Sequence, residues 1–360
     1  MRKISKKTEN RKLDHIKICL KDDVEFKTKS AGFEEVELIH QSLPELDYQK
    51  IDMTTKFLGR QFDYPILINA MTGGHPESAK VNKTLAQFAS EFNIPMEVGS
   101  QRAAIENVDL IGTYRIAREV TKSVGGNIFL IGNIGGGQLV QHYGIEEVQK
   151  CIEMIDADAL AIHLNPLQEA LQKEGNVNYQ NLLGKIKEII TQIKVPIIIK
   201  ETGNGLSQGA LKSLKDIGVK YVDVSGAGGT SWAAVESYRH GKDNEFAKIA
   251  NNFRDWGIPT VVSTIMAVKI GLNVICSGGI RTGIDIAKSI ACGADIAGIA
   301  LPFLEHAFQE DLDGLRDQMK IFIRELQTSM FLTKSANIEK MKTAKKIFLG
   351  KIKEWIDATI

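Results

Sequence analysis

Residues 273–302, NVICSGGIRTGIDIAKSIACGADIAGIALP, contain the pattern that decides the fold. Short, almost entirely apolar runs begin and end this stretch, as expected for parallel strands that are buried on both faces. Between them, Gly278, Gly279 and Gly283 would let the backbone approach an anion closely at the start of a helix. The stretch therefore predicts a strand–helix–strand unit with a phosphate site, and tight turns alone are the alternative.

The same alternation of apolar run and amphipathic pattern recurs from residue 65 onward. The predicted strands are PILINAM (65–71), IPMEVG (94–99), NIFLIGN (127–133), ALAIHL (159–164), VPIIIKE (195–201), YVDVSG (221–226), NVICSGG (273–279) and DIAGIA (295–300). Strands that alternate with helices in this way predict an α/β fold, a (β/α)8 TIM barrel, with a doubly wound open sheet as the alternative. A further apolar run, IPTVVST (258–264), is predicted to be helical because Pro259 suits a first turn.

Three parts of the chain follow from this assignment. We predict an N-terminal extension at residues 1–64, the barrel at residues 65–311 and C-terminal helices, packed on the barrel, at residues 312–360. The C-terminal part is predicted from apolar residues at helical spacing, which are Leu315, Met319, Phe322, Ile323 and Leu326. The basic start, MRKISKKTENRK, is by itself most simply a solvated arm.

The bulk composition excludes several classes of function. The 360 residues are 43% hydrophobic and 25% charged, with a formal net charge of +1, so neither nucleic acid nor a membrane is an expected partner. No apolar segment approaches the roughly 18 residues of a membrane span, and none follows the basic start as in a signal peptide. Four widely spaced cysteines without a CxxC pair fit a reducing cytoplasm, which is the location we predict.

Polar residues collect where the predicted strands end, which is where barrel enzymes carry their active sites. The stretch HLNPLQE, residues 163–169, follows the fourth strand and offers an imidazole, amides and a carboxylate but no Ser, Cys or Lys. Lys200 ends the fifth strand, where an unpaired ammonium group is costly. It could form a Schiff base, stabilise an electron-rich ring as a cation, or be a structural lysine paired with Glu201 or Asp223.

In combination, several motifs resemble those of type 2 isopentenyl diphosphate isomerases. They are RKLDHI, NAMTGG, VGSQR, IGNIG, HLNPLQE, IIKETG, SGAGGTSW and SGGIRTG. The resemblance runs from about residue 10 to the C-terminal helix, although the last motif alone is shared with other phosphate-binding barrels. Asp14 stands where the family has Glu, and Lys334 stands where the family usually has Gly.

The resemblance implies a flavin-dependent isomerase. The family interconverts isopentenyl and dimethylallyl diphosphate by moving a proton, and it requires reduced FMN, normally reduced by NADPH, together with Mg²⁺. It implies flavin contacts at Met71, Thr72, Gly73, Ser100, Asn133, Lys200, Ser225 and Thr230. It implies that the flavin phosphate is surrounded by Gly278, Gly279, Arg281, Ala300 and Leu301. Lys200 is then a partner of the reduced flavin ring and not a Schiff base.

The resemblance also implies how the substrate is held. The expected substrate-binding residues are Arg11, Lys12, Ser100, Arg102, His163, Asn165 and Gln168. Part of the N-terminal extension is then a flap over the substrate, and Glu169 is expected to hold Mg²⁺. Gln168 is assigned to positioning near the alkene, because the reduced flavin is the main acid–base group. Trp232 would wall the site and Glu236 would relay protons, with a packing Trp and a helix-surface Glu as the alternatives. A homotetramer or larger homo-oligomer is expected.

Two other functions compete with this prediction. An FMN-dependent 2-hydroxy-acid oxidase or dehydrogenase would share the barrel and the phosphate site, but it needs a histidine base and arginines for a carboxylate. His163 lies within the pattern HxNxxQE, which fits diphosphate and Mg²⁺ better. A non-catalytic phosphate- or flavin-binding barrel would not need Arg11, Lys12, Gln168 and Glu169 together.

Overall fold

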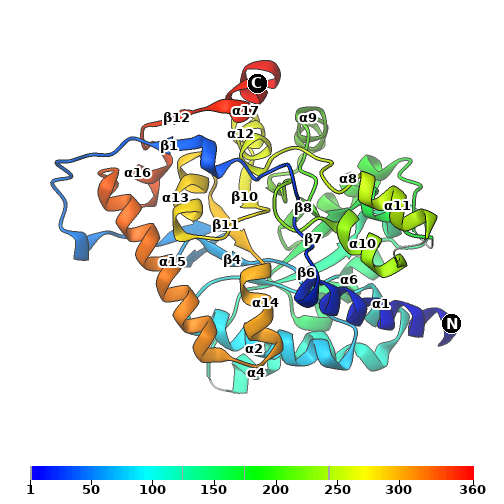
Figure 1. The fold of residues 1–360 in the computed structure, drawn as a ribbon. Coiled ribbons are helices and arrows are strands. Elements are labelled where there is room, and N and C mark those ends of the chain that lie inside the picture. The colour runs from blue at the N-terminus through cyan, green and yellow to red at the C-terminus, as the bar shows by residue number, and fades with distance from the viewer. Residues whose placement is uncertain (1, 124, 174, 242–243) are drawn as a thin grey trace.

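A closed barrel of eight parallel strands forms the centre of the computed structural model, which describes residues 2–123, 125–173, 175–241 and 244–360 (Figure 1). The strands are β4 (Ile66–Ile68), β5 (Met96–Glu97), β6 (Leu130–Gly135), β7 (Ala159–Leu164), β8 (Ile197–Glu201), β9 (Tyr221–Asp223), β10 (Asn273–Ser277) and β11 (Ile296–Ile299). β11 pairs with β4, with Ala297 opposite Ile66, and this pairing closes the ring. The predicted (β/α)8 barrel is confirmed, and the open-sheet alternative is wrong.

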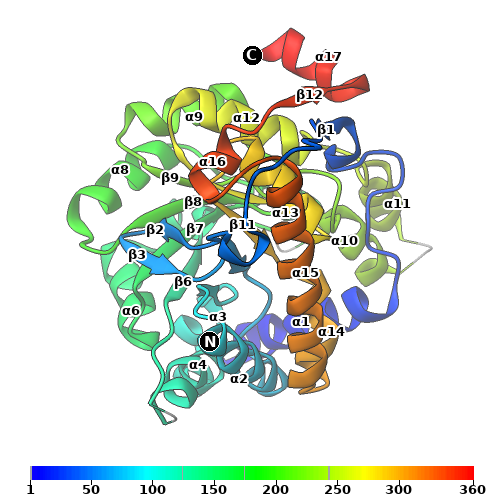
Figure 2. The same cartoon turned by 90° about the vertical axis from the view of Figure 1, so that its left-hand side faces the viewer.

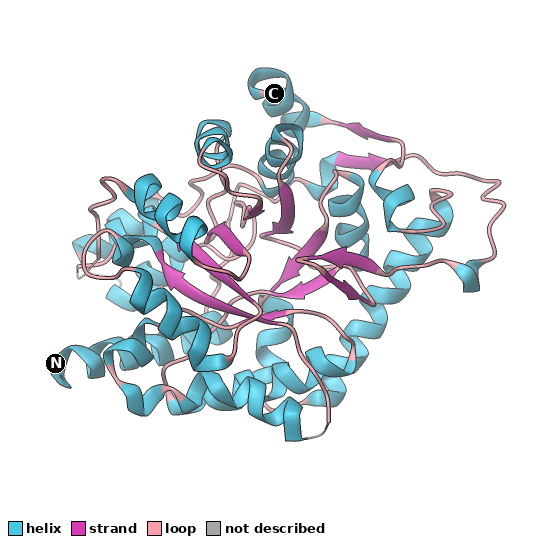
Figure 3. Cartoon of the chain, turned by 180° about the vertical axis from the view of Figure 1, so that it is seen from behind, coloured by secondary structure: helices cyan, strands magenta, loops and turns pink. Residues whose placement is uncertain are grey.

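Helices surround the ring of strands on all sides (Figure 3). The helices that follow the strands are α2 (Pro76–Glu91), α4 (Gly112–Ser123), α6 (Ile145–Ile155), α8 (Leu182–Gln192), α9 (Gln208–Asp216), α12 (Thr260–Ile270), α13 (Gly283–Ala291) and α14 (Leu301–Phe308). The run at 258–264 enters α12, with Pro259 as its N-cap residue, so the predicted helix is confirmed. None of the helices that the structure describes has both the length and the apolar character needed to cross a bilayer.

Shorter helices lie at the carboxyl ends of the strands or in the loops. They are η3 (Val108–Leu110), α3 (Arg102–Glu106), α5 (Gly136–Leu139), α7 (Pro166–Ala170), α10 (Trp232–His240) and α11 (Glu245–Asn252). α7 begins immediately after β7 because Pro166 occupies its first position, where the missing N–H costs nothing. The sequence HLNPLQE is therefore a strand end followed by one helical turn.

The N-terminal extension covers both ends of the barrel. It contains α1 (Arg2–Lys21), η1 (Phe33–Glu35), β1 (Val36–Leu38), η2 (Tyr48–Lys50), β2 (Thr55–Phe57) and β3 (Arg60–Phe62). α1 packs on α10, α3 and α14 at the carboxyl ends of the strands. β2 and β3 form a hairpin whose Phe57 and Phe62 pack against the amino-terminal ends of the strands, beside Phe129 and Tyr221. The extension thus closes one end of the barrel and borders a cavity at the other.

The C-terminal part packs along the outside of the barrel. It contains α15 (Leu312–Leu332), α16 (Ile338–Lys342), β12 (Lys346–Phe348) and α17 (Gly350–Thr359). α15 lies beside α13 and α14 (Figure 2) and buries Leu315, Met319, Phe322 and Leu326, as their spacing predicts. β12 pairs antiparallel with β1, with Val36 opposite Phe348. The division of the chain into residues 1–64, 65–311 and 312–360 stays a prediction.

Candidate active site

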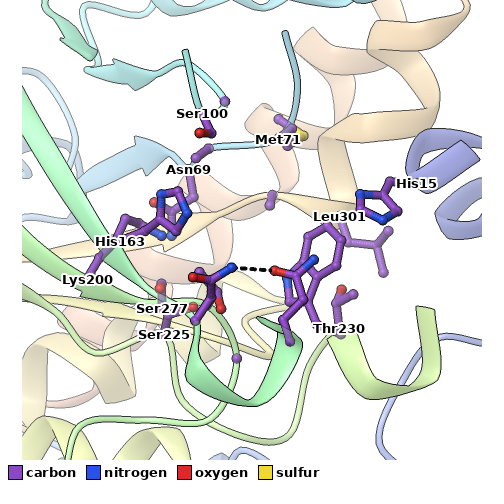
Figure 4. A pocket seen from close by; sticks show the side chains of 18 of the residues that line it. His15, Asn69, Met71, Ser100, His163, Lys200, Ser225, Thr230, Ser277 and Leu301 are labelled. Atoms are coloured by element: carbon purple, nitrogen blue, oxygen red, sulfur yellow. Dashed lines mark hydrogen bonds between the residues drawn. The ribbon is translucent and has the colours of Figure 1, made fainter. Parts of the chain in front are cut away.

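A deep cavity opens at the carboxyl ends of the barrel strands, beneath α1 (Figure 4). Together with its open mouth it encloses about 1580 Å³. The predicted site residues that line it are Arg11, Lys12, Met71, Ser100, Arg102, Asn133, His163, Asn165, Gln168, Glu169, Lys200, Ser225, Thr230, Trp232, Gly278, Gly279, Arg281, Ala300 and Leu301. Residues that are far apart in the sequence therefore share one cavity, and most of them are strand ends.

Three predicted site residues do not line this cavity. Thr72 is buried, and its hydroxyl shares a 2.8 Å hydrogen bond with the Ser78 hydroxyl. Gly73 packs so closely on Tyr114 that an added Cβ would lie 1.9 Å from the ring atom Cε1. Glu236 lies behind the cavity wall with an exposed fraction of 0%, so the helix-surface alternative for this residue is wrong. The flavin contacts at Thr72 and Gly73 stay predictions.

Lys200 lies at the floor of the cavity within a buried cluster of charges. Its Nζ is 3.4 Å from Asp223 Oδ2 and 4.0 Å from Glu97 Oε2. Burial lowers the pKa of the Lys200 ammonium, but Asp223 and Glu97 outweigh burial and raise it above its ordinary value. Lys200 is therefore a fixed cation, which argues against the Schiff-base hypothesis because that chemistry needs a neutral amine.

Glu201, the other partner that the sequence suggested for Lys200, makes different contacts. The Glu201 carboxylate turns to the backbone and accepts hydrogen bonds from the N–H groups of Thr202, Gly203 and Asn204 at 2.5–2.8 Å. Burial raises the pKa of Glu201 to about 7, while these amides act in the opposite direction. Of the two suggested partners, Asp223 is thus the one that pairs with Lys200 through its side chain.

Cationic side chains gather where α1 borders the cavity. Arg11, Lys12 and Arg102 all line it. Burial, followed by the charges of Arg11 and Arg102, lowers the pKa of Lys12 to about 7. Arg102 is held by Glu106 at 2.7 Å, and Arg11 Nη1 donates to Gln172 Oε1 at 2.8 Å. Crowded, partly desolvated cations of this kind favour a polyanionic ligand. The hypothesis of a merely solvated arm is therefore wrong for this part of α1.

The stretch HLNPLQE forms a compact network of amides around one carboxylate. Asn165 Nδ2 donates to Gln168 Oε1 at 3.0 Å and to Glu169 Oε1 at 3.1 Å. The backbone N–H of Asn176 donates to Glu169 Oε2 at 2.5 Å. Within the described ranges, no group of three His, Cys, Asp or Glu side chains has the arrangement of a metal site. A lone buried carboxylate fits Mg²⁺ only if phosphate oxygens and waters complete its coordination.

Glu236 connects this network to α1. Its carboxylate accepts from Gln168 Nε2 at 3.2 Å and Gln172 Nε2 at 2.5 Å, and it pairs with His15 Nε2 at 3.2 Å. Burial raises the pKa of Glu236, but His15 and Arg239 outweigh burial and lower it to about 2. A carboxyl group with this pKa stays ionised at neutral pH, which favours positioning of Gln168 over proton donation. Trp232 packs edge-on against His15, with ring centroids 5.1 Å apart.

The glycine-rich end of the cavity has the properties of an anion site. Gly278 and Gly279 have φ values of 105° and 77°, which favour glycine, and their backbone borders the cavity. Arg281 lies at this rim and pairs with Glu25 through Nε at 2.9 Å. The floor also has buried polar atoms without a partner among the described residues, at Asn69 Oδ1 and Thr202 Oγ1. A bound flavin with a phosphate would fit both features.

Several residues that line the cavity were given no role from the sequence. They are His15, Asn69, Gln138, Gln172, Thr202 and Ser277. Glu97, which bonds to Asn133 behind the lining, was also missed. His15 follows Arg11 by four residues, so helical spacing places the two on one face once α1 is recognised. Glu97 is the single charged residue of the apolar run IPMEVG, and a charge within a buried strand indicates a functional or paired group.

Comparison with known proteins gives consistent results. The FMN-dependent dehydrogenase family matches residues 4–116 and 165–346. An isopentenyl-diphosphate delta-isomerase of Pyrococcus furiosus is 44% identical, over 97% of this chain and 89% of the relative. The enzyme of the same name from Archaeoglobus fulgidus is 45% identical, over 97% of this chain and 99% of the relative. A flavocytochrome b2 mutant has the same fold, with a TM-score of 0.67 at 17% identity over 96% of this chain and 84% of that one.

Proposed function

The chain belongs to the isopentenyl-diphosphate delta-isomerase family, and from this premise we propose that it interconverts isopentenyl diphosphate and dimethylallyl diphosphate with reduced FMN. One observation carries the proposal. A single cavity is lined both by the Gly278–Gly279 turn and by the cluster of Arg11, Lys12 and Arg102. Two anion-binding groups are needed when a flavin phosphate and a substrate diphosphate are bound together. A 2-hydroxy-acid oxidase also needs a flavin-phosphate site, but it needs a site for a carboxylate where the isomerase needs one for a diphosphate.

Residues at the strand ends would hold the flavin. When bound, reduced FMN supplies the proton donor and acceptor for the alkene. The ammonium of Lys200 stays charged between Asp223 and Glu97, and it would stabilise negative charge on a bound reduced flavin. Arg281, with the glycine turn, would bind the phosphate. The remaining proposed contacts are Met71, Thr72, Gly73, Ser100, Asn133, Ser225, Thr230, Ala300 and Leu301.

The substrate diphosphate would bind between α1 and the ends of β5 and β7. Guanidinium groups of Arg11 and Arg102 match phosphate oxygens in a bidentate manner, and Lys12 adds a point charge. Ser100, His163 and Asn165 would complete this site. Gln168 would orient the alkene, since Glu236 fixes its amide. Trp232 and α1 would exclude water from the carbocation-like species that forms when the alkene is protonated.

The remaining features of the proposal concern the metal, the reductant and the assembly. Glu169 would bind Mg²⁺ together with diphosphate oxygens, and NADPH would reduce the flavin. A homotetramer or larger assembly is supported by exposed apolar side chains around the β1–β12 pair, at Ile39, Ile347 and Leu349. A cytoplasmic location is supported by four cysteines that are all free. Light scattering on the purified protein measures the assembly size.

One experiment tests the function directly. The protein is incubated with FMN, NADPH or dithionite, Mg²⁺ and isopentenyl diphosphate in D2O, and the substrate is followed by NMR. We expect dimethylallyl diphosphate that carries deuterium. The absence of both product and deuterium exchange, with flavin bound and reduced, would contradict the proposal. Anaerobic bleaching of oxidised flavin by lactate or mandelate would instead support the oxidase.

A further inference from the structure

A chain of hydrogen bonds runs from the cavity floor to His163 on the cavity wall. Asn133 Nδ2 donates to Glu97 Oε1 at 2.6 Å, and Asn133 Oδ1 lies 2.8 Å from His163 Nδ1. The second carboxylate oxygen, Glu97 Oε2, faces Lys200 Nζ at 4.0 Å and accepts from the backbone N–H of Ala70 at 3.4 Å. Both oxygens of Glu97 therefore face hydrogen-bond donors or a cation. Figure 4 shows His163 and Lys200 side by side, across the cavity from His15.

This chain determines which nitrogen of His163 carries the proton. An ionised carboxylate only accepts, so Asn133 must turn its NH2 toward Glu97 and its carbonyl oxygen toward His163. The carbonyl oxygen also only accepts, so His163 Nδ1 must be the donor. A neutral imidazole has one N–H, so Nε2 carries a lone pair. Nε2 has no hydrogen-bond partner within the part of the chain that the structure describes, and His163 borders the cavity.

The charges around His163 keep the ring neutral in the free protein. Burial, followed by the cations Lys200 of β8 and Lys12 and Arg11 of α1, lowers the pKa of His163 to about 3. Glu97 of β5 is the one acidic group in the hydrogen-bonded chain. Burial raises the pKa of Glu97 to about 7, with Lys200 acting in the opposite direction, so its carboxylate predominates at pH 8. A lone pair at Nε2 then faces the site where we place the diphosphate.

We propose that Glu97 and Asn133 are positioning residues that hold the proton of neutral His163 on Nδ1, so that a diphosphate oxygen binds at Nε2 only together with a proton taken up from solvent. This inference rests on the proposed function, because it concerns the side chain that faces the substrate diphosphate. The balance is simple: one proton moves from buffer to Nε2, and no bond to phosphorus changes. The resulting imidazolium keeps its Nδ1–H bond to Asn133 and donates from Nε2 to the anion.

A single substitution should reverse the arrangement. In Glu97→Gln the carbonyl oxygen of the new side chain is expected to face Lys200 and the Ala70 N–H. The NH2 group of the glutamine would be repelled by these two donors. The NH2 then faces Asn133, which must turn its own oxygen toward that group. Asn133 would consequently donate to His163 Nδ1, and the proton of the neutral ring would move to Nε2. Diphosphate would bind without proton uptake at His163.

Nitrogen NMR tests the tautomer. The FMN-loaded protein, labelled with 15N-histidine, is measured at pH 8, and the resonances of His163 among the seven histidines are identified by their loss in His163→Asn. We expect the proton on Nδ1 in the parent protein and on Nε2 in Glu97→Gln. Asp223→Asn is the matched control, because Asp223 also pairs with Lys200 but makes no hydrogen bond to Asn133 or His163 in the described part of the chain, and it should retain the parent pattern. An Nε2 proton in the parent, or no change in Glu97→Gln, overturns the inference.

Calorimetry tests the proton uptake. Inorganic pyrophosphate is titrated into the FMN-loaded protein with Mg²⁺ at pH 8, in buffers of different ionisation enthalpy. Two proteins are compared, one with and one without Glu97→Gln. Because Lys12 also takes up protons, both of them carry Lys12→Arg. We expect adding Glu97→Gln to reduce the uptake by about one proton. Equal uptake overturns the inference while leaving the proposed function intact. Failure of the parent to bind pyrophosphate contradicts the proposed function and, with it, the uptake, whereas the NMR pattern of the free protein still decides the tautomer.

Discussion

The two ends of the barrel use the same strands for opposite purposes. At the amino-terminal ends, Phe57, Leu58 and Phe62 of the hairpin fill the opening with apolar side chains. At the carboxyl ends, the buried ammonium of Lys200 borders a cavity and pairs with buried Asp223. Stability and chemistry are thus separated along the length of each strand, since an apolar plug can be optimised without disturbing the charges. Substitutions at the amino-terminal ends should therefore change stability, and substitutions at the carboxyl ends should change activity.

The largest expected effect is loss of stability at the plugged end. Phe62 is 1% exposed and packs edge-on against Phe129, with ring centroids 5.5 Å apart. Phe62→Ala leaves a cavity there, so the free energy of unfolding should fall by about 3–5 kcal/mol. Urea unfolding measures the loss, and the isomerase activity of the remaining folded protein should be unchanged. A large loss of activity per folded molecule would show that the two ends are not independent.

Glu169→Gln, at the open end of the barrel, should have the opposite effect: it should lower activity and leave stability almost unchanged. The carboxylate is the one we assign to Mg²⁺, and its amide replacement keeps the shape of the side chain. The isomerase rate should fall by about 10²–10³-fold, the range for loss of one group that stabilises the reacting charges. Flavin binding, measured by fluorescence titration, and the urea midpoint should change little. Release of the flavin would refute the metal role of Glu169.

Lys12→Arg should change the pH dependence of anion binding. The pKa of Lys12 is about 7 in the free protein, so above pH 7 the neutral amine must take up a proton before it pairs with a diphosphate. Affinity for pyrophosphate should therefore weaken with rising pH, by about tenfold per unit from this group. Arginine stays charged throughout, so the variant should lose that part of the slope. Titrations between pH 7 and 9 measure it, and an unchanged slope would contradict the assignment.

The smallest expected effect is that of Ile198→Val, which compares an apolar and a charged position of one strand. Ile198 and Lys200 are two residues apart on β8 and so point to the same side of the sheet, into successive layers of the barrel. Ile198→Val should cost only about 0.5–1.5 kcal/mol of stability. The spectrum of the bound flavin and the rate should be those of the parent protein. A shift of the flavin spectrum would mean that the apolar layer also supports Lys200.

Most of the barrel was predictable because its elements are locally encoded. Apolar runs such as ALAIHL coincide with β7, and Pro259 marks the start of α12 as expected. An extension over one end of the barrel was predicted, but the β2–β3 hairpin that fills that end was not, although Leu58 and Gly59 with φ values of 50° and 80° make a tight turn in the sequence FLGRQF. Its two strands span three residues each, too few for an alternating pattern to stand out.

The candidate site was predictable as a set of residues but not as a set of contacts. Lys200 and HLNPLQE stand out locally because polar groups follow apolar strands. The sequence alone could not choose between Asp223 and Glu201 as the partner of Lys200, since the choice depends on which way Glu201 turns at its strand end. The bond between Asn133 and His163, on β6 and β7, depends on the register between two strands, which is a tertiary property.

The pairing of β1 with β12 has a consequence for synthesis of the protein. Val36 leaves the ribosome long before Phe348, its partner, has been made. β4 likewise waits for β11 before the ring can close. The nascent chain must therefore carry an exposed strand edge for most of its translation, a state prone to mispairing with other chains. Slow translation of the final segment would prolong this state, whereas a chaperone that covers β1 would shorten it.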